Sequence, residues 1–149
     1  MYGEKPKRDY APGELTQDER LLAAVSHGSV LVGASVIIPI IIWALQKDKS
    51  PYVRFQAMQA AAWQITQWVA GLLVGICYFC YIIMVAAASS GSSSSEPPAG
   101  LIAGFCIFIP IFLGLAIFTV GGIIGAIMTF MGNNFRYPII ANFVENRFR

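Results

Sequence analysis

The chain has 149 residues, of which 56% are hydrophobic and only 12% are charged, whereas a soluble domain carries roughly a quarter of charged residues. Its formal net charge of +2 is too small to indicate a nucleic-acid-binding protein. These values exclude a sizeable soluble domain. They predict an all-α integral membrane protein, with one helical domain over 16–149 behind a disordered tail over 1–15.

Three uncharged stretches follow one another and are expected to lie in a membrane. They cover 21–46, 55–95 and 97–135, with lengths of 26, 41 and 39 residues. About 20 apolar residues cross a bilayer as a helix, so we predict three transmembrane-type helices over about 21–46, 52–88 and 100–131. The polar N-terminal tail is like neither a secretory signal nor an organelle transit peptide. This favours the plasma membrane of a bacterium.

Two helix starts are readable. Thr16 and Glu19 have the spacing of a capping box, in which each side chain bonds the backbone N–H of the other residue. Ser50 and Pro51 supply an N-cap residue followed by proline at the first helical position. Within the first segment, Pro39 is expected to kink the helix.

The second helix begins with a polar arc. Gln56, Gln59, Gln64 and Gln67 fall within about 140° at 100° per residue, and Gly71 continues the same arc. One interpretation is a face that packs on neighbouring helices through side-chain amides and close backbone approach. The other is a polar path used by a substrate.

A Ser-rich loop over 89–99 and a short amphipathic tail over 136–149 complete the chain. The loop has no hydrophobic residue to anchor it. In the tail, Ile139, Ile140, Phe143 and Val144 share one side of a short helix that Pro138 can start, which predicts an interfacial helix.

Two topologies remain open for the first segment. If it crosses fully, six basic residues lie on one side of the membrane and four on the other; if it dips in and returns, all ten share one side. Basic residues favour the cytoplasm. In both topologies the C-terminal tail is therefore cytoplasmic and the Ser-rich loop lies outside.

Glycine pairs with small-xxx-small spacing occur in both long segments, where they allow close contact between helices. The pairs are Gly71 with Gly75, Gly100 with Gly104, and Gly121 with Gly125. Contact within the chain and self-association are both compatible with this spacing.

No catalytic or metal-binding constellation is recognisable. Cys77, Cys80 and Cys106 lie at membrane depth without further ligands, so we interpret them as small packing residues. His27, the only histidine, is interpreted as a hydrogen-bonded residue near the interface, although ligation of a haem or pigment is conceivable. We therefore predict neither enzyme activity nor a cofactor.

Two blocks of sequence resemble a family of small bacterial membrane proteins of unknown function that is related to the chloroplast inner-envelope protein-import (Tic) channel component, the Tic20-like proteins. One block centres on Ser50, Pro51 and Arg54, and the other on Arg136, Tyr137 and Pro138. The resemblance implies a helical membrane protein, and through the chloroplast relatives a link to protein translocation. It assigns no catalytic residue.

Three functional hypotheses follow. The first is a non-enzymatic membrane protein in contact with the lipid bilayer, either a small oligomer or an accessory subunit of a larger membrane complex. The second is a translocation or channel component in which the glutamine arc lines a path. The third is a pigment or haem binder through His27.

Overall fold

The computed structural model describes residues 14–32, 36–90 and 99–147, and these residues form helices with no strand among them. The elements are α1 (Gln17–Gly28), the 3-10 turn η1 (Ser29–Leu31), α2 (Ile37–Gln46), α3 (Pro51–Ser89), α4 (Ala99–Phe130) and α5 (Ile140–Arg147). The predicted helix starts are confirmed: Thr16 and Glu19 form the capping box, and Ser50 caps α3 with Pro51 in its first turn. Most of the Ser-rich loop and of the N-terminal tail lies outside the described residues.

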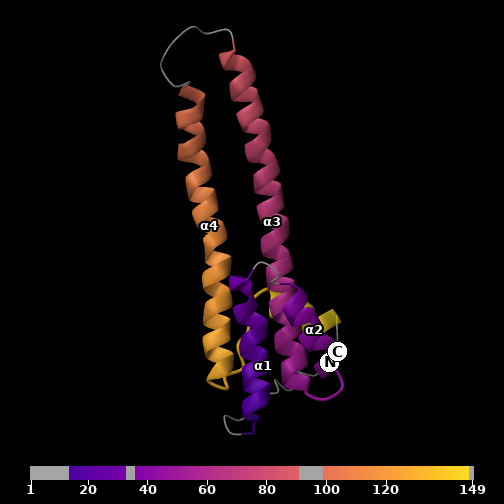
Figure 1. Ribbon diagram of the computed structural model, residues 1–149. Coiled ribbons are helices and arrows are strands. Elements are labelled where there is room, and N and C mark those ends of the chain that lie inside the picture. The colour runs from indigo at the N-terminus through magenta and orange to yellow at the C-terminus, as the bar shows by residue number, and fades with distance from the viewer. Residues whose placement is uncertain (1–13, 33–35, 91–98, 148–149) are drawn as a thin grey trace, which may run out of the picture.

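Two helices, α3 and α4, are long and apolar enough to cross a membrane. They run side by side along the length of the molecule (Figure 1). Large apolar side chains stay exposed along both, for example Leu72 and Met84 on α3 and Ile102 and Ile127 on α4. The described residues therefore confirm an all-helical fold with two helices that could span a membrane.

Three full spans are not confirmed, because the first apolar stretch is not one helix. It divides into α1 with 12 residues and α2 with 10, both shorter than the roughly 20 residues that cross a bilayer. We predicted that Pro39 would kink one continuous helix, and this prediction is wrong. Pro39 lies in the first turn of α2, where a backbone N–H has no intrahelical partner to lose. α1 and α2 pack against each other as a helical hairpin (Figure 1).

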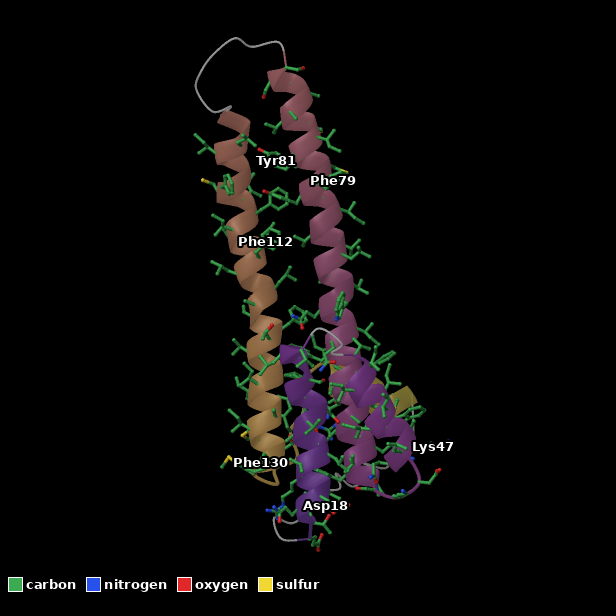
Figure 2. The ribbon with its side chains drawn as sticks, viewed as in Figure 1. Asp18, Lys47, Phe79, Tyr81, Phe112 and Phe130 are labelled. Carbon is green, nitrogen blue, oxygen red and sulfur yellow. The ribbon has the colours of Figure 1, made fainter. Side chains whose placement is uncertain are left out.

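The molecule is broad at one end and narrow at the other (Figure 1). We call the part built from α1, η1, α2, residues 51–67 of α3, residues 119–130 of α4 and α5 the broad half, and the remaining α3–α4 hairpin the narrow half. Figure 2 shows Asp18, Lys47 and Phe130 at the broad end, and Phe79 and Tyr81 along the narrow half.

Charged residues follow the same division. In the described segments they belong to the start of α1, the α2–α3 connection, the start of α3 and the chain after α4. All of these meet in the broad half (Figure 1). The narrow half is held together by aromatic rings instead, with Tyr78 and Tyr81 packed on Phe108 at centroid distances of 4.9 and 5.6 Å.

The chain after α4 turns sharply back toward α3. Gly132 adopts φ +84°, a left-handed conformation that suits glycine, and the Asn133 N–H donates to the Met128 carbonyl at 3.0 Å. This is the bond pattern of a glycine-terminated helix. Residues 133–137, which belong to no helix, are thereby carried across the base of α3.

The predicted amphipathic tail is shorter than 136–149 and buries a different side. α5 begins only at Ile140, and Ala141 and Val144 pack inward, whereas Ile139 and Phe143 are 85% and 64% exposed. The predicted apolar face is divided because the preceding backbone is held by α3 side chains, which sets how α5 meets the bundle.

Candidate functional site

A buried polar network lies in the broad half, among α1, the start of α3 and the chain that follows α4. Its side chains are those of His27, Gln56, Gln59, Gln64 and Tyr137, and each is at most 3% exposed. Buried polar groups in an apolar environment need partners, since an unpaired one costs about 1–3 kcal/mol. The bonds described below meet nearly all of that need.

His27 stands at the centre of the network, with a partner at each ring nitrogen. Its Nε2 lies 3.1 Å from Gln56 Oε1, and its Nδ1 lies 3.1 Å from the hydroxyl of Tyr137. The Gln56 amide nitrogen donates elsewhere, to Asn134 Oδ1 at 3.0 Å and the Phe135 carbonyl at 3.1 Å. Gln56 Oε1 must then accept, so we assign the hydrogen of neutral His27 to Nε2 and let Nδ1 accept from Tyr137. A haem or pigment could bind His27 only by breaking one of these bonds.

Gln59 holds the non-helical chain after α4. Its Oε1 accepts from the Tyr137 N–H at 3.0 Å, and its Nε2 donates to the Phe135 carbonyl at 3.1 Å. The two groups replace the backbone partners that residues 135–137 lack outside a helix. Irregular backbone at membrane depth is tolerated when it is buried in protein in this way.

Gln64 closes the network at the tip of the α1–α2 hairpin. Its Nε2 donates to the Ser26 carbonyl at 3.2 Å and to Ser29 Oγ at 2.9 Å. Carbonyls at a helix end have no intrahelical partner, so Gln64 stabilises the end of α1. Its Oε1 is buried without a hydrogen-bond partner among the described residues.

Aromatic rings pack around the polar network. Trp63 stacks on Tyr137 with ring centroids 4.1 Å apart and an interplanar angle of 7°, and its Nε1 donates to the Phe118 carbonyl at 2.8 Å. Phe135 meets His27 edge to face at 5.6 Å. The polar groups are thus enclosed in a tightly packed shell.

The three glycine pairs singled out for helix packing differ: the two on α4, including Gly100 and Gly104 beside Val85 and Tyr81 of α3, lie against neighbours, and the pair on α3 does not. A Cβ built on Gly121 would come within 2.8 Å of Trp63 Cζ2, and one on Gly125 within 2.9 Å of His27 Nδ1. Gly71 and Gly75 have no neighbour within 4 Å of such a Cβ. The structure therefore gives the α4 pairs close contacts inside the chain and leaves the α3 pair open.

Gln67 also lies apart from the network. It donates only to Thr119 Oγ1, at 3.3 Å, and it borders an open groove of about 530 Å³ between η1, α3 and α4 that also contains Gly71 and Leu115. The amides of Gln56 and Gln59 and the amide nitrogen of Gln64 are hydrogen-bonded to protein partners. The glutamine arc is therefore divided into a buried network and one residue at a groove.

At the charged end, Glu19 connects α1 to α3. Its Oε2 accepts from the Thr16 N–H at 2.9 Å, and its Oε1 accepts from the Ser50 hydroxyl at 2.6 Å while that hydroxyl oxygen also caps Val53. Donors around a carboxylate favour its charged form. The hydrogen bond from Ser50, followed by the backbone bond from Thr16, lowers the pKa of Glu19 below 4.5.

We expect Glu19→Gln to remove part of the acid sensitivity of the protein. Because the folded-state pKa of Glu19 is lowered, its charged form stabilises the fold above pH 4.5, and this contribution is lost as the pH falls through the folded pKa. The free energies of unfolding of wild type and variant should therefore converge as the pH falls. Denaturant titrations in detergent at several pH values measure this, with the exposed Asp18→Asn as control. A difference that stays constant with pH would contradict the assignment.

The residues of the two sequence blocks have structural roles. Ser50 and Pro51 start α3 while Arg54 is half-buried near its base. Arg136 forms an ion pair with Glu145 at 2.6 Å and lies 5.2 Å from the centroid of the Phe55 ring. Tyr137 is buried in the network, and Pro138 is exposed before α5.

We predicted that the three cysteines would pack inside the chain, and this prediction is wrong. Cys77, Cys80 and Cys106 are exposed and free, because each lies on the outward side of α3 or α4. Over the described ranges 14–32, 36–90 and 99–147, no three His, Cys, Asp or Glu side chains gather in a way that could hold a metal ion.

Sequence reasoning did not find the pairing of His27 with Gln56 and Tyr137, which lie 29 and 110 residues away. The regular spacing of the glutamines was the available signal for one side of the network. Nothing in the order of residues indicated that Tyr137 returns to α1, because that depends on the turn at Gly132.

A comparison with protein families overturns the resemblance to Tic20-like proteins. Residues 18–144 match the model of the magnetosome magnetite crystal formation protein family (MamF/MmsF). No curated protein and no solved structure matches the chain. The Tic-related assignment was wrong, and with it the link to protein translocation. Ser50, Pro51 and Tyr137, on which it rested, cap and pack helices, and such roles recur in unrelated membrane proteins.

Proposed function

Because this chain belongs to the magnetosome magnetite crystal formation protein family, we propose that it serves crystal formation as a non-enzymatic membrane protein. Its contribution is structural: it organises the membrane or a membrane complex rather than transforming a substrate. The observation that carries the proposal is the distribution of polarity. The polar side chains of the network are bonded to one another inside the broad half, while the outside of α3 and α4 is apolar.

The polar network supports a role in assembly of the fold. It joins α1, α3 and the chain after α4 through side chains that are hydrogen-bonded to protein at every polar atom except Gln64 Oε1. A binding site needs polar groups that are available to a ligand, whereas these groups hold the α1–α2 hairpin against the long helices. The network thus holds the α1–α2 hairpin against α3.

The orientation follows from the charged residues. We assign the broad end to the cytoplasm, which the gathering there of Arg20, Lys47, Lys49, Arg54 and Arg136 supports. The Ser-rich loop then lies on the other side of the membrane. The α1–α2 hairpin enters from the cytoplasmic side and returns to it, in line with the shortness of both helices.

The assembled form is a small oligomer or a complex with other membrane subunits. Gly71 and Gly75 support this, because a Cβ at either position would have no described atom of another element within 4 Å, so both would admit another helix closely. The native mass and composition of the complex, recovered in mild detergent through a C-terminal tag, test this part. A homo-oligomer or stoichiometric foreign subunits are expected, and a bare monomer would contradict it.

Crystal formation itself is tested by complementation. The chain is expressed in a magnetosome-forming bacterium that lacks its own members of this family, and crystal number and size are measured by electron microscopy. We expect the wild type to shift crystals toward those of the parent strain, and the exposed variant Cys77→Ser to do the same. Unchanged crystals, despite wild-type protein in the membrane fraction, would overturn the proposed function.

A further inference from the structure

The two halves of the molecule differ in the area they occupy across the membrane. Five helices contribute to the broad half, whereas only α3 and α4 continue into the narrow half (Figure 1). Both halves have an apolar exterior: α2 exposes Ile37 and Leu45, and the narrow half exposes Phe79 and Ile102. Lipid can therefore surround both, but it meets a wider body at one end.

The hairpin has the dimensions of a single leaflet. At 1.5 Å per residue, α2 is about 15 Å long and α1 about 18 Å. A bilayer with its polar interfaces is about 40–45 Å thick, so one leaflet contributes about 20 Å, and the part of α4 in the narrow half, about 30 Å long, extends through the rest. A hairpin entering from the charged end thus adds its cross-section to that leaflet and adds none to the opposite one.

α5 adds to the same leaflet. It packs on α3 through Ala141 and Val144 and turns Ile139 and Phe143 outward. Its neighbour Arg136 is paired with Glu145 on the helix itself, so the charges stay near the interface while the two apolar side chains meet lipid. Such interfacial helices bind membranes in a curvature-dependent way.

The hairpin is held rigidly enough to act as a wedge. Gln64 bonds its tip at Ser26 and Ser29, Gln56 bonds His27 in the same last turn of α1, and Ser50 bonds Glu19 at its base. These contacts tie α1 to α3 near both ends of α1. The excess area in one leaflet is therefore a fixed property of the fold.

We infer that the protein is a membrane wedge that favours bilayers which are convex on its charged side. A body that is wider in one leaflet has a lower free energy where that leaflet is expanded, and by reciprocity it promotes the same curvature. With the charged end in the cytoplasm, the favoured membranes are vesicles or invaginations that project into the cytoplasm. The inference rests on the membrane orientation in the proposed function and not on the role in crystal formation.

Sorting between flat and curved membrane tests the wedge. The full chain, labelled at a C-terminal tag, is reconstituted into giant vesicles of phosphatidylcholine and phosphatidylglycerol from which thin tubes are pulled. Vesicles are separated by whether the tag faces outward or inward. With the charged end outward we expect the density ratio of tube to vesicle to exceed about twofold, a bias on the order of RT. With the charged end inward the protein should be depleted from the tube.

The reversal of sign separates a wedge from other causes of sorting. Equal densities, or the same sign in both orientations, would overturn the inference even if complementation of crystal formation succeeds. Conversely, failed complementation with intact sorting would overturn the proposed function alone. Both tests use the wild-type chain, so neither depends on a variant that folds.

A variant then tests whether the hairpin causes the bias. His27→Ala removes the bond to Gln56 and should loosen the hairpin, which lowers the tube enrichment toward equality. Cys77→Ala, exposed in the narrow half, should sort as the wild type does. If His27→Ala remains monodisperse and sorts normally, the hairpin is not the wedge.

Discussion

Replacing Gln56 with leucine is expected to cause one of the largest losses of stability available from a single buried side chain. Gln56 is 0% exposed, and its amide is bonded to His27, Asn134 and the Phe135 carbonyl. Leucine removes the partner of His27 Nε2 and of Asn134 Oδ1, while the Phe135 carbonyl keeps its bond from Gln59; each group left unpaired in an apolar environment costs about 1–3 kcal/mol. We expect a loss of about 2–5 kcal/mol in the free energy of unfolding.

Gln67→Leu is the matched control for this change. Gln67 lies on the same helix, but it is only half-buried and makes a single bond of 3.3 Å to Thr119. Its replacement should cost less than about 1 kcal/mol. Both variants can be compared by circular dichroism during denaturant titration in detergent. If the two variants lose similar amounts of unfolding free energy, the hydrogen bonds of Gln56 are not the main source of stability in the broad half.

Replacing Gly125 with leucine should disrupt the broad half by steric conflict. A Cβ at Gly125 would lie 2.9 Å from His27 Nδ1 and 3.0 Å from Phe135 Cε1, before the rest of the leucine side chain is added. Overpacking a well-packed interior usually costs 1–3 kcal/mol. Because His27 must also shift away from Tyr137, we expect about 3 kcal/mol or more, measured as loss of monodisperse protein and of unfolding free energy.

Gly75→Leu offers the same substitution on the other long helix. Among the described residues, no atom of another element lies within 4 Å of a Cβ at Gly75, and leucine is a better helix former than glycine by about 0.8 kcal/mol. The monomer fold should therefore be unchanged or slightly stabilised. If Gly75→Leu unfolds the protein as severely as Gly125→Leu, the difference in packing between the two pairs is refuted.

Local features of this chain were predictable because they depend on neighbouring residues. The apolar stretches predicted the two long helices α3 and α4, and the capping pattern of Thr16 and Glu19 predicted where α1 begins. Ser50 followed by Pro51 similarly predicted the start of α3. Hydropathy and capping act within a few turns of helix, so a sequence displays them directly.

Features that depend on the path of the chain were predicted only in part. The first apolar stretch had enough hydrophobic residues for a span, yet it folds into two short helices whose bonds to Gln56 and Gln64 lie in another element. The family assignment was wrong for a related reason. The residues that suggested it reflect helix caps and packing, which do not identify a function.

The sequence by itself determined that this protein is helical and suited to a membrane, since its long uncharged stretches can be satisfied in lipid only by closed hydrogen-bonded helices. Only the tertiary structure decided which polar residues are buried together. It distinguished Gly125, in contact with His27, from Gly75, which has the same spacing motif but no described atom of another element within 4 Å of a built Cβ. The physical reason is that the turn at Gly132 and the return of the α1–α2 hairpin bring distant segments to one half of the molecule, and no local pattern encodes that meeting.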